Sequence, residues 1–177
     1  AIYTVKKTVD AYNRRSGRKV AFGISPFGIW ANKKSNPDGS LTGGKQSYYA
    51  QYADTRGWVR KGWVDYIIPQ LYWPFSHEVA AYAALADWWS NAVKGTRVRL
   101  FIGQGLYRVG TERSWQPREL VDQMRYNQRL FNVDGTVIFS YRNVFTPGNA
   151  RMKEAVSRIL QKCWRYPARL PDYPNVK

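Results

Sequence analysis

The stretch that most constrains the fold of this chain is GWVDYIIPQLYWPF, at residues 62–75. Its first part, residues 64–71, is a near-continuous apolar run, which is typical of a strand covered on both faces of a parallel sheet. Its second part gathers rings and an amide: Gln70, Tyr72, Trp73 and Phe75. Such side chains suit a sugar-binding floor, because pyranose C–H faces lie on aromatic planes and sugar hydroxyls need polar partners. Burial in the core is the alternative for Trp73 and Phe75.

Three further segments repeat this pattern. Strand-like runs begin at Val20, Val64, Val98 and Thr136, at intervals of 44, 34 and 38 residues. Such intervals suit right-handed crossovers between parallel strands. We therefore predict an α/β domain whose functional face is built from the four loops at the carboxyl ends of the strands. A complete eight-stranded barrel needs roughly 250 residues, so 177 residues predict a half-barrel or a small open sheet.

Helical spacing and capping residues predict one helix before the first strand and one after each strand. The first helix is expected to end at Ser16 and Gly17, and the others to span residues 45–61, 76–94, 117–131 and 146–164. Ser76 and Thr146 are the expected N-caps of the third and last helices. Residues 31–44 form a long polar loop. The domain is expected to cover residues 1–164, and residues 165–177 to form an extended Pro-rich tail.

The net charge of +16 indicates affinity for an anionic partner, such as nucleic acid, a membrane surface or an anionic cell-wall polymer. The basic residues are scattered and match no nucleic-acid-binding motif, so nucleic acid is the least favoured partner. A single cysteine, Cys163, and a single histidine, His77, exclude a disulfide framework and a zinc site with several histidines. We expect neither a metal nor a cofactor.

The sequence contains no apolar run of the length that a transmembrane helix requires. No signal peptide is visible, but residue 1 falls inside a helical pattern, so this observation says little about the compartment.

Four long segments resemble glycosyl-hydrolase-like family 10. They are FGISPFGIW at residues 22–30, YADTRGWVRKGWVDYIIPQLYWPF at 52–75, RLFIGQGLYRVG at 99–110 and GTVIFS at 135–140. The resemblance runs over residues 20–164 in the same order and at similar spacing. It implies a TIM-barrel glycosidase of bacterial cell envelopes, acting outside the cytoplasm on peptidoglycan-type glycan. It also implies that this chain corresponds to helix four and strands five to eight, the second half of the barrel.

The catalytic acids are not evident in this chain. Glycoside hydrolysis ordinarily uses two carboxyl groups that flank the scissile bond. The predicted strand ends instead carry uncharged side chains: Ser25, Gln70, Gln104 and Ser140. The family's Asp-Asp-Tyr-Phe segment at the end of strand four has no match, and the resemblance places it before Ala1. Whether the chain is an enzyme by itself therefore stays open.

The other acidic residues have structural interpretations. Asp54 is the remaining weak catalytic candidate, although pairing with Arg56 or capping a helix is the favoured interpretation. Asp65 lies at the amino end of its strand. Asp134 precedes a glycine and is expected in a turn. The acids in predicted helices, Glu78, Asp87, Glu119, Asp122 and Glu154, are expected on solvated faces.

Eight residues are predicted to bind substrate, because they follow the strands on their carboxyl side: Ser25, Trp30, Gln70, Tyr72, Trp73, Gln104, Tyr107 and Arg142. They are expected to converge on one cleft. The function predicted is the substrate-binding half of a glycoside hydrolase. A non-catalytic carbohydrate-binding module is the alternative, and a basic nucleic-acid-binding domain is less favoured. Besides the glycan, the expected partner is a missing N-terminal barrel half or a second copy of the chain, since four strands leave two sheet edges open.

Overall fold

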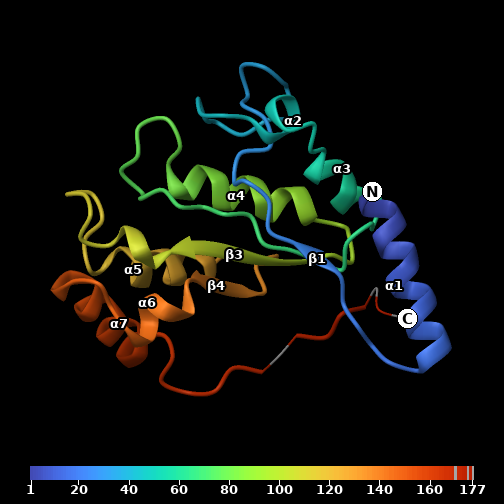
Figure 1. The fold of residues 1–177 in the computed structure, drawn as a ribbon. Helices are drawn as coiled ribbons and strands as arrows, with labels where there is room; N and C mark the ends of the chain where they lie inside the picture. The colour runs from blue at the N-terminus through green and yellow to red at the C-terminus, as the bar shows by residue number, and fades with distance from the viewer. Residues whose placement is uncertain (170, 175, 177) are drawn as a thin grey trace.

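A parallel four-stranded sheet organises the molecule (Figure 1). The computed structural model describes residues 1–169, 171–174 and 176. The strands are β1 (Gly23–Ile24), β2 (Tyr66–Ile67), β3 (Arg99–Gly105) and β4 (Gly135–Phe139), and their spatial order follows the chain. Consecutive parallel strands joined by helical connections are the arrangement of a (β/α) barrel. The predicted α/β class and barrel-type architecture are therefore confirmed, with β1 and β4 at the two edges of the sheet.

β1 and β2 each contain two regularly paired residues. Backbone hydrogen bonds nevertheless continue along residues 64–71, the run that was predicted as a strand. Ile68 N–H donates to the Ile24 carbonyl at 2.8 Å, and Leu71 N–H donates to the Gly103 carbonyl at 2.9 Å. Pro69 interrupts the regular ladder, because proline has no N–H to donate. The predicted central strand therefore exists as an extended segment paired on both sides.

The two faces of the sheet have different surroundings. Ile67, Leu100 and Ile102 are fully buried in one cluster with residues of α4 (Tyr82–Val93). Figure 1 shows α4 lying alongside β3. Alternation places every second residue on the opposite face, which in a closed barrel is the interior. On that inner face at the β4 edge, the Val137 and Phe139 side chains are 40% and 55% exposed.

The remaining helices extend from the amino-terminal helix to the helix before the tail. They are α1 (Ile2–Ser16), α2 (Ser47–Ala50), α3 (Thr55–Arg60), η1 (Leu106–Arg108), α5 (Glu119–Asn127), α6 (Tyr141–Phe145) and α7 (Ala150–Lys162). As predicted, α1 ends at Gly17, which has φ of 68°, a conformation that glycine adopts easily. α5 and α7 pack together around a second core that includes Leu106, Trp115 and Ile159.

Two of the predicted helix boundaries are wrong in the first half of the chain. The helix expected at residues 45–61 is divided into α2 and α3, because the Asp54 carboxylate accepts from Gly57 N–H at 3.0 Å and starts a new helix. Tyr52, in the break, has φ of 51°. The next helix begins at Tyr82, not near Ser76, because His77 Nδ1 accepts from Ala80 N–H at 3.0 Å and holds a loop.

The second half of the chain departs from the prediction in similar ways. Residues 117–118 precede α5, which begins at Glu119 and ends before residue 131. Asn149, not Thr146, caps the last helix, because its Oδ1 accepts from Met152 N–H at 2.8 Å. α6 was not predicted at all. A single turn of helix leaves little periodicity in a sequence.

Residues 165–169, 171–174 and 176 of the tail carry no helix or strand, as predicted; the tail's other positions, 170, 175 and 177, lie outside the described residues. In Figure 1 the tail runs from α7 back toward α1. The Tyr173 ring lies 5.6 Å from the Tyr66 ring, and Arg99 Nε donates to the Asp172 carbonyl at 2.6 Å. The tail is therefore attached to the amino ends of the strands. Across the described ranges, no helix has both the length and the apolar character needed to span a membrane.

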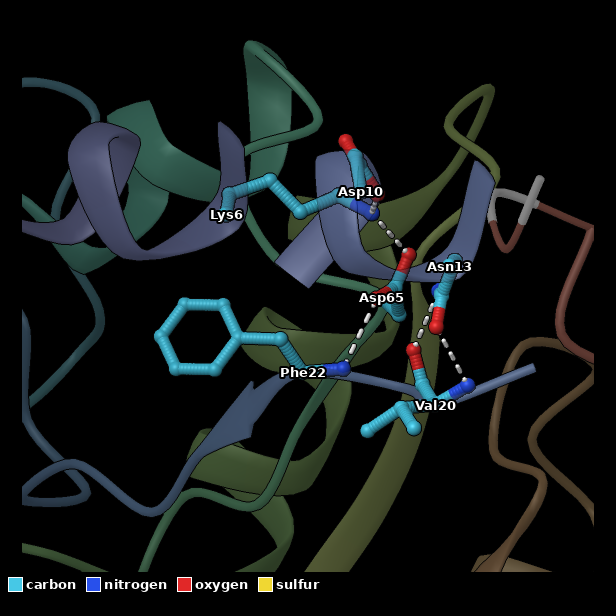
Figure 2. Close-up of polar contacts among 6 residues, drawn as sticks. All are labelled: Lys6, Asp10, Asn13, Val20, Phe22 and Asp65. Atoms are coloured by element: carbon cyan, nitrogen blue, oxygen red, sulfur yellow. Dashed lines mark hydrogen bonds and ion pairs between the residues drawn. The ribbon is translucent and has the colours of Figure 1, made fainter. Parts of the chain in front are cut away.

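A buried ion network joins α1 to the amino ends of β1 and β2 (Figure 2). Lys6 Nζ lies 2.7 Å from Asp65 Oδ1 and 2.7 Å from Asp10 Oδ1. Asp65 is fully buried, and its other oxygen accepts from Phe22 N–H at 2.8 Å. Burial alone would lower the pKa of Lys6, but the hydrogen bonds and charges of Asp10 and Asp65 outweigh it and raise this pKa above 10.5. Asn13 similarly accepts from Val20 N–H and donates to the Val20 carbonyl.

An aspartate also links β3 to β4. Asp134 Oδ2 accepts from Leu100 N–H at 2.9 Å, and Asp134 N–H donates to the Leu100 carbonyl at 2.8 Å. Its Oδ1 lies 2.9 Å from the Arg99 guanidinium. Asp65 makes the matching pair of bonds with Phe22. Asp134 therefore joins two strands rather than closing an isolated turn, which corrects the sequence interpretation.

Candidate functional site

Three aromatic rings meet at the carboxyl end of the sheet. They belong to Tyr72, Tyr107 and Phe139, and their centroids are 5.8, 6.0 and 5.9 Å apart. We call them the ring trio. The rings follow or end β2, β3 and β4, so each strand contributes one. A Cβ at Gly105 would lie 3.2 Å from atoms of both tyrosine rings, closer than ordinary van der Waals contact, so a side chain there would displace them slightly. Burial, and then the neighbouring Tyr107, raise the pKa of Tyr72, so its hydroxyl remains a donor at neutral pH.

A polar pair lies at the same end of the sheet. Gln70 Nε2 donates to the Ser25 carbonyl at 3.1 Å and to Ser25 Oγ at 3.3 Å, and Ser25 Oγ donates to the Ile68 carbonyl at 2.9 Å. These bonds fix the orientation of the Gln70 amide and direct its nitrogen toward Ser25. Gln70 and Tyr72 are two positions apart in an extended segment, so they project from the same face. The structure therefore brings Ser25 to Gln70 and Tyr72 to Tyr107 at this end of the sheet, and their role in binding a substrate stays a prediction.

Gln104 does not reach this cleft, which corrects its predicted role. Its side chain is fully buried, and its Nε2 donates to the Tyr82 hydroxyl at 3.2 Å and to Gln123 Oε1 at 3.0 Å. Alternation places Gln104 on the same side of β3 as Leu100 and Ile102, facing the helices. Gln104 therefore belongs to a polar network inside the core.

Trp30 is also buried and is only 4% exposed. Its ring stacks on Trp88 with centroids 5.8 Å apart, and its Nε1 donates to Asp54 Oδ1 at 3.1 Å. The ring is thus covered by α4 and the loop before α3. Trp30 supports that loop and offers no free face to a ligand.

Trp73 is intermediate between core and cleft. Its ring is half-buried and contacts Phe27 edge-on with centroids 5.4 Å apart. A Cβ at Gly28 would lie 2.9 Å from Trp73 Cζ3, so the loop after β1 packs directly on this ring. The Trp73 carbonyl accepts from Gln123 Nε2 at 3.1 Å. Trp73 therefore contacts the core, as the alternative interpretation predicted, and the residue remains partly accessible.

Arg142 lies on α6, at the carboxyl end of β4, and is exposed. Two neighbours that the sequence analysis did not single out, Tyr141 and Phe145, are 75% and 68% exposed, and their rings are 4.3 Å apart. Phe139 of the ring trio was missed as well. The sequence did carry a signal for these three residues. They end or follow the fourth predicted strand, as Tyr72 and Tyr107 follow the second and third strands.

The acidic candidates have structural partners. Asp54 caps α3 and accepts from Trp30, whereas Arg56 pairs with Asp38 at 3.1 Å and not with Asp54. Of the two interpretations of Asp54, helix capping describes its contacts. Among the described residues, no group of three or more His, Cys, Asp and Glu side chains is arranged to hold a metal ion.

Glu119 was expected on a solvated helix face, and this expectation is wrong. Its Oε1 accepts from Phe75 N–H at 2.8 Å and from Gln123 Nε2 at 3.0 Å. Burial raises the pKa of Glu119, and these two hydrogen bonds oppose the rise. The carboxylate fixes the segment that follows Trp73 to the start of α5, and so supports the loop beneath the cleft.

Parallel strands in consecutive order, helices packed on one face and rings at the carboxyl ends define a (β/α)-barrel type of domain. Comparison with known families makes the class specific. The profile of the family described as Glycosyl hydrolase-like 10 matches residues 5–120. The chain belongs to this family.

Characterised relatives agree with this assignment. The chain is 42% identical over 153 residues to "Glycosyl hydrolase DigH" of Escherichia coli (strain K12), which covers 82% of this chain and 34% of that protein. It is 42% identical over 159 residues to "Glycosyl hydrolase YngK" of Bacillus subtilis (strain 168), covering 88% of this chain and 30% of that protein. The chain thus spans about a third of the length of the curated relatives it matches.

Proposed function

We propose that this chain supplies the substrate-binding half of a glycoside hydrolase that acts on peptidoglycan-type glycan in the bacterial cell envelope, outside the cytoplasm. The observation that carries the proposal is the ring trio beside the Ser25–Gln70 pair at the carboxyl end of the sheet. A sugar needs a ring face for its C–H groups and fixed amide or hydroxyl groups for its hydroxyls. Both are present within one edge of the fold, on the face where (β/α) barrels bind their substrates.

The proposal assigns the catalytic carboxyls to a segment outside this chain. Asp54 and Glu119 are engaged with backbone N–H groups, and Glu112, in the loop after η1, pairs with Arg108. A segment that continues the barrel would pair with the edges at β1 and β4 and cover Val137 and Phe139 on the inner face. Its own carboxyls would then face the ring trio across the cleft. A non-catalytic carbohydrate-binding module is the second candidate, favoured by the same lack of an available carboxyl pair.

The experiment compares the 177-residue chain with two variants on purified, peptide-free cell-wall glycan. Bound protein, released reducing ends and mass in solution are measured. We expect binding without hydrolysis. Tyr72→Ala should weaken binding about tenfold, as loss of a stacking ring does, and Phe131→Ala is the matched control, because Phe131 is fully exposed and lies outside the cleft.

Each outcome has a distinct meaning. Hydrolysis by a folded monomer would overturn the assignment of the catalytic acids to another segment. Binding that falls steeply as salt is raised, and equally in all three proteins, would indicate polyanion binding through counterion release instead of sugar stacking. Hydrolysis that appears only when the remaining barrel segment is added would favour the enzyme over the carbohydrate-binding module.

A further inference from the structure

The exposed face of α6 carries two large rings in contact. Tyr141 and Phe145 are four positions apart, so they lie one above the other on one side of the helix. Their centroids are 4.3 Å apart, the planes are tilted by 33°, and the side chains are 75% and 68% exposed. Paired rings left in water at this exposure make a contiguous apolar patch, and such patches mark binding surfaces.

The patch is held rigidly although α6 has a single turn. Ser140 N–H donates to Asn143 Oδ1 at 3.2 Å, and Ser140 Oγ donates to the same oxygen at 2.9 Å. Asn143 Nδ2 in turn contacts Met152 Sδ of α7 at 3.6 Å, and Val144 packs on the second core. The buried side of α6 is therefore fixed by its neighbours. A fixed ring pair binds a ligand without first losing much conformational freedom.

A cationic residue accompanies the ring pair on α6. Arg142 follows Tyr141, and a rotation of about 100° per residue places Arg142 closer to the ring side of α6 than to the side of Val144. Arg142 is exposed, and within residues 1–169, 171–174 and 176 its guanidinium has neither an ion pair nor a hydrogen bond to a side chain. A guanidinium presents a planar fork of donors that fits a carboxylate.

The patch continues the cleft. α6 begins two residues after the Phe139 ring, and it packs against η1, which carries Tyr107. Two members of the ring trio therefore border α6. A polymer lying across the trio would extend onto α6 and meet the ring pair and Arg142 together.

We propose that α6 is a subsite for a carboxylate-bearing sugar of the bound polymer. Tyr141 and Phe145 carry the face of its pyranose ring, and Arg142 binds its carboxylate. The proposal rests on the proposed function and adds to it that the cleft selects for acidic sugars at this position. A second copy of the chain that covers the same rings is the competing occupant, and the mass in solution separates the two.

The test uses the 177-residue chain and two soluble probes: a β-1,4-linked N-acetylglucosamine oligomer, and an oligomer of the same length in which alternate sugars carry a lactyl carboxylate. Affinity is measured by calorimetry and mass by light scattering. We expect the carboxylated probe to bind roughly tenfold more tightly than the neutral one, the size of a single charge-assisted contact. Arg142→Gln should abolish this preference, whereas Arg142→Lys should retain part of it, and the control Phe131→Ala should leave affinity for both probes unchanged.

The ring pair is tested with Tyr141→Ala/Phe145→Ala. This variant should weaken the binding of both probes about tenfold, with an unchanged circular dichroism spectrum, and Phe131→Ala is again the control. Undiminished binding by the ring variant would overturn the subsite while the proposed function stands. A ring variant whose mass in solution differs from that of the parent would assign the rings to a protein interface and overturn the subsite too. Failure of the parent chain to bind either probe would overturn the proposed function itself.

Discussion

The two aspartates that join neighbouring strands provide a matched experiment on burial. Asp65 and Asp134 each exchange two hydrogen bonds with one residue of the preceding strand, and each also pairs with a cation. Their surroundings differ. The side chains of Asp65 and its partner Lys6 are 0% and 8% exposed, whereas those of Asp134 and its partner Arg99 are 19% and 33% exposed.

The perturbation is aspartate to asparagine at each site. In Asp65→Asn, one amide oxygen can still accept from Phe22 N–H, but the new NH2 group faces the Lys6 ammonium, and a buried ion pair is broken. Breaking a buried pair costs about 3–5 kcal/mol of unfolding free energy. The equivalent change at Asp134 breaks a pair that water partly solvates, and should cost about 1 kcal/mol. The first value is a large share of the roughly 5–15 kcal/mol that stabilises a domain.

The assay is urea unfolding at neutral pH, followed by circular dichroism, with the free energies compared at a common slope. A second variant isolates the ion pair. In Asp65→Asn the Lys6 ammonium keeps Asp10 as its one acidic partner. Adding Lys6→Met removes this buried ammonium and should restore part of the loss. Equal costs at Asp65 and Asp134, or a double variant less stable than Asp65→Asn, would refute the argument that burial sets the energy of these contacts.

Four further changes have definite expected outcomes. Gln104→Ala should lower the unfolding free energy by about 2–3 kcal/mol, because it leaves buried partners unsatisfied, and glycan affinity of the folded protein should be unchanged in a calorimetric titration. The pKa of Glu119 is raised in the folded protein, so the unfolding free energy should fall as pH rises from below 4.5 through the folded pKa. Glu119→Gln should flatten this dependence in unfolding curves measured at several pH values. The raised pKa of Lys6 stabilises the fold below pH 10.5 and ceases to do so as pH rises through the folded value, so Lys6→Met should remove this alkaline loss. Trp30→Ala should lower the unfolding free energy by about 3–5 kcal/mol in urea.

Sequence patterns predicted the order of the elements because each strand is a short apolar run with a turn signal after it. They also predicted that Gln70, Tyr72 and Tyr107 would lie at one end of the sheet, since the carboxyl ends of parallel strands share an edge. The end of α1 was predicted because Gly17 adopts a left-handed conformation that other residues avoid. These predictions depend on local chemistry alone.

The predictions that failed depend on register and on distant partners. Gln104 follows its strand much as Gln70 does, but alternation from Leu100 turns it toward the helices, and its partner Gln123 lies nineteen residues further along the chain. Trp30 is buried because Trp88 of α4 covers it. No pattern within either segment indicates these contacts. Counting alternate positions from the buried Leu100 would have placed Gln104 correctly.

Many acidic residues of this chain hold its structure together. Four acids at decisive positions accept a backbone N–H: Asp54, Asp65, Glu119 and Asp134. Each carboxylate thereby fixes a helix start, a loop or a strand pair, and a group held in this way is poorly placed to exchange protons with a substrate. The surface acids Glu112, Asp122 and Glu154 each pair with an arginine four positions away in the sequence. In a chain of net charge +16 carboxylates are scarce: 12 Asp and Glu stand against 28 Lys and Arg. These structural roles support the proposal that the acid and the nucleophile or base come from strands outside this chain.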